Sequence, residues 1–427
     1  MTKAIFALVV VVFAAAVVMM PAPAAPQPGP AVAVDPPSVS VCPVDEGSGR
    51  STTVGVVATV AGPGLFTAFA GGAPAGSAPF ETGASGVASI PLQEVAPIGV
   101  AAGLVELPGD EAASASLMVG TESVAHESCL TMPAPQTLLG GGSTTTGEEY
   151  DIQLMNPYSG GAVVNLTVVS ESGIESASQL RGIAVPSRSS AVVDMDQILP
   201  GRASLAVTVE AATGSVMAVG HLTAGTDSAL WDAVAPALDW FIPVPSGAGS
   251  QVVISSGVAS DVEYQVDLYG GEGLLEAFQT GVVPARGFSV VDPGSAAGPT
   301  AVRIVSTQPV SVFLRNVGPS GVALTTGSTV AAAQWLLPSA GMAPGGTGRM
   351  VVLNAGLDAA TVTVTAISDA PVAQELSVPA GTVVEFPAIE GGAQAYTLNG
   401  DGLLVPLWVT TTETATAYST GVPLVDE

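Results

Sequence analysis

The sequence holds 427 residues, of which 48% are hydrophobic and only 11% are charged, so it has enough apolar side chains for several packed domains. Nine basic residues stand against 36 acidic ones, and the formal net charge is −27. A surface of this charge repels the phosphates of nucleic acids and of anionic lipids, so neither is expected as a partner.

Residues 1–37 have the composition of an export segment followed by a tether. Lys3 precedes the run from Ala4 to Met20, which has no polar side chain, and this pattern is typical of a signal peptide or an N-terminal membrane anchor. As a helix the run would be about 26 Å long, against about 30 Å for the hydrocarbon core of a bilayer, so cleavage and anchoring both stay open. The Pro- and Ala-rich residues up to Pro37 predict an extended tether. We expect the rest of the chain outside the cytoplasm, either secreted or anchored to the cytoplasmic membrane.

Residues 38–135 contain both cysteines of the chain, Cys42 and Cys129. Disulfides form in exported proteins, and closing a loop of this length would stabilise the fold by roughly 4 kcal/mol in the chain-entropy model. A shared metal is disfavoured because no third or fourth ligand lies nearby in the sequence. We predict a diverged β unit that carries a Cys42–Cys129 bridge.

The rest of the chain repeats itself at intervals of just under a hundred residues. A Trp-x-x-Pro opener, an apolar strand that ends in a small polar residue, and a later Val-Pro step recur in the same order. The prolines of the steps lie 98 and 95 residues apart (284 − 186 and 379 − 284). A repeat this long is a small domain, which predicts units over residues 136–235, 236–331 and 332–427. The openers are Asp239–Pro243 and Gln334–Pro338, and the steps are Val185-Pro186, Val283-Pro284 and Val378-Pro379.

Alternation within these units predicts strands with one buried face. Val362, Val364 and Ala366 alternate with threonines, and Asn399-Gly400 is the sharpest hairpin signal of the chain. Six or seven strands in about 100 residues suit an immunoglobulin-like sandwich. We therefore predict an all-β fold of tandem immunoglobulin-like β-sandwich repeats after an N-terminal apolar helix. A β-propeller-like arrangement, in which each unit supplies two blades, is the alternative.

Motifs of catalysis and metal binding do not stand out in the sequence. His126 and His221 lie in different predicted units, and neither has a metal-ligand or triad partner beside it. Gly-x-Ser-x-Gly, His-Glu-x-x-His, phosphate-loop and dinucleotide patterns do not occur. We predict no enzymatic activity, no cofactor and no metal. One enzymatic alternative stays open, because 36 acidic residues offer many carboxylate pairs for glycoside hydrolysis.

Three tryptophans are the sequence signal for ligand binding. Trp231 and Trp240 belong to a short cluster of acidic and aromatic residues, and Trp335 repeats the position of Trp240 in the next unit. Exposed aromatic rings at a junction between units can stack on sugars, so Trp231, Trp240 and Trp335 are candidate stacking residues. The alternative is that Trp240 and Trp335 are repeated structural plugs between neighbouring sandwiches.

One stretch of the chain resembles a known family. It runs from Cys129 through the Gly-, Ser- and Thr-rich residues Gly140–Gly147 to Leu154–Pro157, and an early Cys42-Pro43 pair and the Trp-x-x-Pro openers accompany it. These features resemble the DUF5719 family, exported actinobacterial proteins of unknown function. The resemblance implies no catalytic residues. We therefore predict a non-catalytic scaffold or interaction protein of the cell envelope, whose partner is an envelope component or a protein. Carbohydrate or cell-wall polymer binding is the alternative function.

Overall fold

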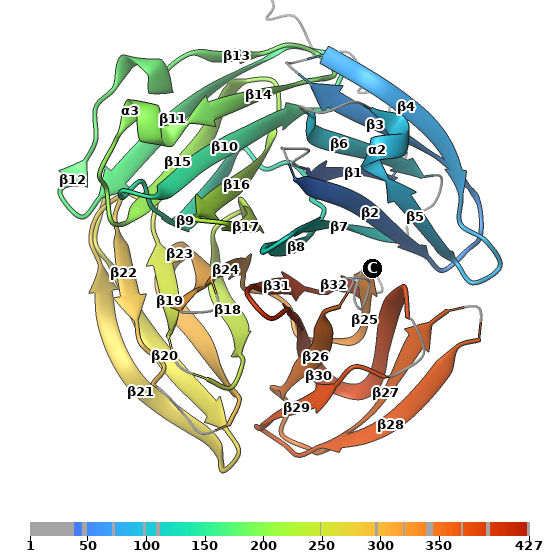
Figure 1. Ribbon diagram of the computed structural model, residues 1–427. Helices are drawn as coiled ribbons and strands as arrows, with labels where there is room; N and C mark the ends of the chain where they lie inside the picture. The colour runs from blue at the N-terminus through green and yellow to red at the C-terminus, as the bar shows by residue number, and fades with distance from the viewer. Residues whose placement is uncertain are drawn as a thin grey trace, which may run out of the picture. The chain divides into compact units, whose positions relative to one another are not determined.

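The computed structural model describes residues 38–44, 49–70, 73–96, 100–107, 112–247, 249–294, 298–318, 321–338, 345–368, 370–389 and 393–424. The predicted export segment, apolar helix and tether of residues 1–37 lie outside these ranges. The described residues are mostly in strands, which form four successive sets of antiparallel sheets (Figure 1). The prediction of an all-β chain is confirmed.

Unit 1, residues 38–128, contains two four-stranded sheets. The first sheet has, in spatial order, β1 (Ser38–Pro43), β6 (Val100–Leu107), β3 (Pro63–Ala70) and β4 (Ala73–Glu81). The second has β5 (Val87–Pro91), β2 (Arg50–Ala58), β7 (Ala112–Gly120) and β8 (Val124–Ser128), and a short helix α2 (Leu92–Val95) follows β5. Val54 of one sheet and Phe66 of the other belong to a single buried cluster. The two sheets therefore pack on each other as a sandwich.

Unit 2, residues 136–232, repeats this arrangement. Its first sheet has β9 (Gln136–Gly142), β15 (Leu205–Thr213), β11 (Ala162–Ser170) and β12 (Gly173–Ile174), with β13 (Ile183–Val185) also paired to β11. Its second sheet has β14 (Ser189–Asp194), β10 (Glu148–Asn156), β16 (Met217–Ala224) and β17 (Asp227–Asp232). Two short helices, η1 (Ser178–Leu180) and α3 (Met195–Ile198), connect the strands. The strand order is the same as in unit 1, although unit 1 lacks the Trp opener and the Val-Pro step.

Unit 3, residues 237–326, keeps this order with one strand shared by both sheets. That strand, β23 (Thr300–Gly318), pairs with β18 (Ala237–Val244) and β20 (Val262–Gly270) through its first half, and β20 pairs with β21 (Gly273–Val283). Its second half pairs with β19 (Ser250–Ser255) and β24 (Gly321–Thr326), and β19 pairs with β22 (Phe288–Val291). The two layers of this unit are thus continuous through β23.

Unit 4, residues 332–424, follows the same plan around β30 (Ala395–Thr411). The first half of β30 pairs with β25 (Ala332–Pro338) and β27 (Ala360–Ile367), while β28 (Val372–Val378) pairs with β27. The second half pairs with β26 (Thr347–Asn354) and β31 (Thr416–Thr420), and β29 (Val383–Pro387) pairs with β26. A last strand, β32 (Val422–Leu424), adds to β25.

The shared strands explain why one hairpin prediction is wrong. Asn399-Gly400 lies inside β30, not in a turn. Gly400 still pairs with Val362 of β27, whereas Leu404 pairs with Asn354 of β26, so the strand changes sheets between these two positions. The glycine permits close packing there, because a Cβ atom on Gly400 would lie 2.6 Å from Cδ1 of Leu404. The Asn-Gly pair marks a crossing between sheets.

Every unit has two packed sheets, as the sandwich prediction expects, but the strand order differs from that of immunoglobulin domains. Immunoglobulin constant domains place strands ABED in one sheet and CFG in the other. Here the first sheet takes the first, sixth, third and fourth strands of a unit, and the second takes the fifth, second, seventh and eighth. Each sheet draws strands from the whole length of its unit, so a unit is a sandwich and not a pair of consecutive propeller blades.

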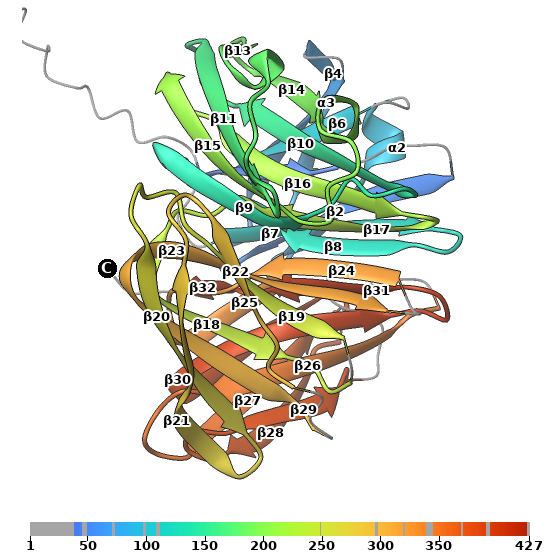
Figure 2. The same ribbon diagram turned by 90° about the vertical axis from the view of Figure 1, so that its left-hand side faces the viewer.

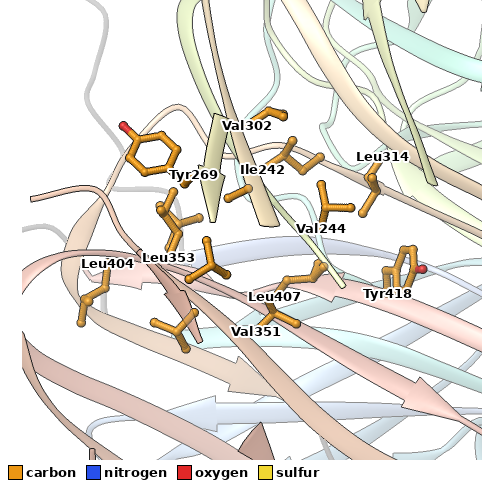
Figure 3. Close-up of a cluster of buried hydrophobic side chains, with 14 of the residues drawn as sticks. Ile242, Val244, Tyr269, Val302, Leu314, Val351, Leu353, Leu404, Leu407 and Tyr418 are labelled. Carbon is orange, nitrogen blue, oxygen red and sulfur yellow. The ribbon is translucent and has the colours of Figure 1, made fainter. Parts of the chain in front are cut away.

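A single buried cluster runs through units 3 and 4 (Figure 3). Ile242 and Val302 from unit 3 belong to the same cluster as Val351, Leu353 and Leu407 from unit 4. Burying such side chains stabilises a fold by roughly 1.5 to 3 kcal/mol each, so these two units depend on each other for part of their stability.

Candidate functional site

The predicted disulfide is present. Cys42 in β1 and Cys129, the residue after β8, are joined, with their Cα atoms 4.4 Å apart. Both side chains are buried in the core of unit 1. The bridge fastens the edge strand of one sheet to the chain leaving the edge strand of the other.

Trp240 and Trp335 occupy equivalent positions, and both are buried. The Trp240 indole Nε1 donates to the Val310 carbonyl oxygen at 2.7 Å, and the Trp335 Nε1 donates to the Leu404 carbonyl oxygen at 3.0 Å. Both accepting carbonyls lie on the shared strand of their unit, close to the crossing between sheets. Only 2% of Trp240 and 1% of Trp335 is exposed, so neither ring offers a face to a ligand. Each indole is held by a hydrogen bond within its own unit.

Trp231 also lies in a core. It is fully buried in β17 and stacks on Tyr150 of β10, with the ring centroids 5.4 Å apart. Trp231 and Trp240 are close in the sequence, which predicted that they would share one ligand-binding patch. The structure places the two rings in the cores of different units. The three candidate stacking residues therefore do not form a common surface.

The edge strands of the four second sheets meet one another. These inner strands, as we call β8, β17, β24 and β31, are in contact in the cyclic order β8, β17, β24, β31 and back to β8. They lie side by side in both views (Figures 1 and 2). Each belongs to a different sheet, and in the described part of the chain no backbone ladder joins one to another. Unpaired strand edges need other partners for their N–H and C=O groups.

Asp227 provides those partners on two sides of β17. Its Oδ1 accepts from the Val124 backbone N–H of β8 at 3.3 Å, and its Oδ2 accepts from the Val322 N–H of β24 at 2.9 Å. The residue is only 3% exposed, and burial raises its pKa to about 7 against the opposing effect of these hydrogen bonds. One carboxyl group thus links units 1, 2 and 3.

Hydroxyl groups complete the cycle on the other two sides. Ser128 Oγ of β8 donates to the Thr420 carbonyl oxygen of β31 at 2.5 Å. Thr420 Oγ1 donates in turn to the Thr326 carbonyl oxygen of β24 at 2.8 Å, and it lies 3.2 Å from Thr325 Oγ1. Every contact between neighbouring inner strands therefore includes a hydrogen bond between a side chain and a backbone group.

Two more carboxyl groups are buried among the inner strands. Glu127 of β8 is 1% exposed and Asp232 of β17 is 6% exposed. Burial raises both pKa values well above the usual range, and the Asp232 charge raises the pKa of Glu127 further. Glu127 Oε1 accepts from the Ser128 N–H at 3.0 Å, whereas Glu127 Oε2 and Asp232 Oδ1 have no hydrogen-bond partner. Two buried acids thus interact across the contact between β8 and β17.

The two histidines lie on strands of different units. His126 is buried in β8 with Nε2 3.1 Å from the Pro338 carbonyl oxygen, and burial lowers its pKa to about 4. His221 lies in β16 opposite Asp151 and Leu230. Among the described residues, no group of three or more His, Cys, Asp or Glu side chains is arranged to hold a metal ion.

A polar pocket opens next to the Ser- and Thr-rich segment that the sequence singled out. Its volume is about 850 Å³. Glu148 on its wall accepts hydrogen bonds from Ser143 Oγ and Thr145 Oγ1, and it lies 3.9 Å from Arg315. The lining consists of Arg50, Thr144, Thr145, Thr146, Gly147, Glu148, Glu149, Asp196, Pro200, Gly201, Thr223 and Gly225.

Sequence reasoning missed the meeting of the inner strands. Glu127 and Asp232 are more than a hundred residues apart and belong to different units, so no local spacing connects them. The available signal was an acidic residue within or at the end of a short apolar strand, where a charge is costly to bury.

The profile of the family described as "Family of unknown function (DUF5719)" matches residues 117–388. This chain belongs to the DUF5719 family. The match begins in β7 and ends just after β29, so it includes most of the repeated units and three of the four inner strands. No curated protein sequence matches the chain.

Solved structures resemble the DUF5719 chain only distantly. A Thermotoga maritima protein, 1070, is 13% identical, with 23% of this chain and 98% of that one covered and a TM-score of 0.19. A chemokine-binding protein, R17, of a rodent gammaherpesvirus is 11% identical over 70% of this chain and 88% of that one, with a TM-score of 0.18. A tetra-tandem repeat from a large adhesion protein is 13% identical over 91% of this chain and 99% of that one, with a TM-score of 0.11.

None of the helices in the described part of the chain has the length and apolar character needed to span a bilayer.

Proposed function

We propose that this protein is a non-catalytic scaffold or interaction protein that works outside the cytoplasm. The cycle of side-chain hydrogen bonds among the inner strands carries the proposal, because it ties four sandwich-like units into one body. A body of this kind can hold a binding surface in a fixed orientation. The units would then act as tandem modules in the manner of immunoglobulin-like repeats, with loops and edges free for contacts.

The disulfide supports the extracytoplasmic part of the proposal. Cys42 and Cys129 are joined, and disulfides persist in oxidising compartments while cytosolic thiols are kept reduced. The apolar run after Lys3 would deliver the chain there, either as a cleaved signal or as an anchor in the cytoplasmic membrane.

The edge of unit 3 is the surface that best suits a partner. β21 lies at the end of its sheet, so one side of its backbone has no strand partner among the residues described. Four large apolar side chains on it are exposed: Leu274 by 42%, Leu275 by 55%, Phe278 by 39% and Val282 by 50%. An open edge with exposed apolar side chains is suited to the addition of a partner's strand.

The charge around this edge selects the partner's chemistry. The hairpin of β20 and β21 carries Glu263, Asp267, Glu272 and Glu276 and no basic residue. We therefore propose an extended segment with alternating apolar and basic side chains as the occupant. A second copy of this acidic chain is disfavoured by charge.

Fractionation of the natively expressed protein tests its location. We expect it in the membrane fraction at full mass, or in the medium with the N-terminal segment removed. In either case its mass should rise by two hydrogens after reduction. Recovery in the cytoplasm with both thiols free would contradict the proposal.

Titration with a synthetic peptide of alternating valine and lysine tests the edge. We expect saturable binding that is lost in Phe278→Glu and kept in Leu357→Glu, which alters a side chain that is 95% exposed in unit 4. A matching peptide with glutamate in place of lysine should not bind. Equal binding of both peptides, or no effect of Phe278→Glu, would exclude β21 as the site.

The polar pocket favours one second function, the binding of a carbohydrate or cell-wall polymer. Its threonine hydroxyls and carboxylates suit the hydroxyl groups of a sugar, and Arg50 suits an acidic substituent. Calorimetric titration with soluble peptidoglycan fragments would detect such binding, and Thr146→Val should weaken it. If the titration shows no heat of binding, the pocket does not bind these fragments and this second function is wrong.

A further inference from the structure

The meeting of the inner strands concentrates acidic groups that the proposed scaffold does not need. Asp227 lies at the start of β17 and Asp232 at its end, and Glu127 lies in the neighbouring β8. All three are buried. Hydroxyl or amide side chains would bridge strand edges without the cost of burying a charge, as Ser128 and Thr420 do on the other sides of the cycle.

Asp227 is held tightly between its two neighbours. Its carboxyl oxygens are within hydrogen-bond distance of backbone N–H groups in β8 and β24, and β24 begins at Gly321 directly beside it. A Cβ atom on Gly321 would lie 1.8 Å from Asp227 Oδ2. Units 1 and 3 thus contact unit 2 through a group whose charge depends on pH.

Glu127 and Asp232 have few hydrogen-bond donors to stabilise their negative charge. Glu127 pairs in register with Ser116 of β7, whose hydroxyl is fully buried and has no hydrogen-bond partner, and the Thr325 side chain of β24 hydrogen-bonds to Glu127. Unpartnered oxygens on Glu127 and Asp232 remain between the strands. Each would be stabilised by a proton.

The other charged and titratable groups near the inner strands are few. Arg50 of β2 lies close enough to Asp227 to oppose its rise in pKa. His126 of β8 is held neutral and binds Pro338 of β25. The inner strand β31 contributes Tyr418, whose hydroxyl lies 3.1 Å from Asn316 Nδ2, and β24 contributes no titratable residue. The strands paired with the inner strands add His221 of β16, opposite Leu230 of β17, and Arg315 of β23, opposite Leu324 of β24. Glu148 of β10 pairs with Ala224, the residue opposite Asp227. The inner strands themselves contribute neither lysine nor arginine.

We propose that the inner strands form a proton-operated lock, in which the protonated carboxyl groups of Asp227, Glu127 and Asp232 hold the units together and their ionisation loosens the contacts between units. The lock is closed in acid and weakened in alkali, which is the reverse of ordinary acid unfolding.

The direction follows from the burial of the three carboxyl groups among strands that bring neither lysine nor arginine to them. An aspartate in the unfolded chain titrates near 3.9, whereas burial raises the folded value to about 7. Between these values the folded protein binds more protons than the unfolded chain, so the contribution of Asp227 to stability is fully present below about pH 4 and is lost as pH rises through 7. The raised pKa values of Glu127 and Asp232 act in the same direction.

Hydrogen exchange at the Val124 and Val322 amides tests the lock at its two ends. We expect their protection, corrected for the intrinsic pH dependence of exchange, to fall by roughly tenfold or more between pH 5 and pH 8. A tenfold change is the effect expected when the pKa of one group differs by one unit between the folded and the unfolded protein. In Asp227→Asn the change should be clearly smaller, because only Glu127 and Asp232 still titrate, and in Glu210→Gln, at an exposed position of β15, it should be as large as in the wild type. Protection that does not depend on pH in the wild type, or the same dependence in Asp227→Asn, would overturn the proposal.

Infrared spectroscopy of the wild-type protein provides a test that does not depend on a variant folding. A band of protonated carboxyl groups should persist at pH 6, where exposed acids are ionised, and should decline above pH 7. If no such band is present at pH 6, the lock does not exist. If calcium chloride alone restores amide protection at pH 8, the carboxyl groups hold a cation instead, and the proposal is wrong.

Discussion

Asn156 and Asn354 make the same contacts in two different units. Asn156 Nδ2 lies 3.1 Å and 3.0 Å from the carbonyl oxygens of Val185 and Pro186, and Asn354 Nδ2 lies 3.0 Å and 3.3 Å from those of Val378 and Pro379. The polar residue that ends the apolar strand therefore binds the Val-Pro step of its own unit. Two sequence features that recur together are thus one structural clamp.

The clamp should be important for stability. Asn354→Ala leaves buried carbonyl groups without a donor, so we expect the free energy of unfolding to fall by about 2 to 3 kcal/mol. Urea unfolding measures the change. Thr361→Ala, at an exposed position of β27, is the control and should alter stability far less. An unchanged midpoint in Asn354→Ala would show that water replaces the amide.

The indole hydrogen bond of the Trp opener is expected to matter apart from the size of the ring. Trp335→Phe keeps an aromatic ring in the core but removes the donor to Leu404, so we expect a loss of about 1 to 3 kcal/mol. Thermal unfolding of Trp335→Phe and Trp240→Phe should show similar losses, because the two rings make equivalent bonds. A clear difference between them would indicate that only one opener acts as a plug.

Removing the disulfide should destabilise unit 1. The double variant Cys42→Ser and Cys129→Ser avoids mixed disulfides, and we expect a loss of about 2 to 5 kcal/mol. Limited proteolysis should then cut within residues 38–128 before it cuts elsewhere. Initial cleavage in unit 3 or unit 4 would show that the bridge does not control the weakest part of the chain.

Neutralising a buried acid should stabilise the protein at high pH. Because the pKa of Glu127 is raised in the folded protein, folding at pH 8 must either take up a proton or bury a charged carboxylate. Either process costs free energy, and Glu127→Gln avoids that cost. We expect a higher Tm for the variant at pH 8 and no gain near pH 4, where the acid is close to neutral in both states. A lower Tm at both pH values would mean that the Ser128 and Thr325 hydrogen bonds outweigh the charge.

Gly321 is a position where a single methyl group should disturb three units. Its φ of +104° disfavours any L side chain, and the added Cβ would displace the Asp227 carboxyl from the Val322 N–H. We expect Gly321→Ala to reduce the exchange protection of Val124 as well as that of Val322, although Val124 lies in a different unit. Gly225→Ala, at a positive φ with open space around it, separates the backbone effect from this displacement.

The sequence predicted what depends on local pattern or on a repeat. The alternation of Val362, Val364 and Ala366 with threonines is the burial pattern of β27, and the pair Cys42 and Cys129 forms the bridge. The hairpin expected at Asn399-Gly400 was wrong, because the same dipeptide also suits a strand that crosses between sheets. Local chemistry does not distinguish these two uses.

The parts that were not predicted depend on contacts between units. Trp231 was grouped with Trp240 from their proximity in the sequence, yet each ring packs in the core of its own unit. Asp227 bonds to Val124 and Val322, which are 103 and 95 residues away. Contacts over such separations are set by the packing of whole sheets, and no period in one sequence encodes them.

The shared strands have a consequence for tolerance to breaks in the chain. In unit 2, β15 and β16 are separate strands, so a cut between Thr213 and Met217 leaves both sheets with complete strands. In units 3 and 4, a cut inside β23 or β30 divides a strand that belongs to two layers. Circular permutation or insertion of a reporter domain should therefore succeed between β15 and β16 and fail at the corresponding place in the C-terminal half.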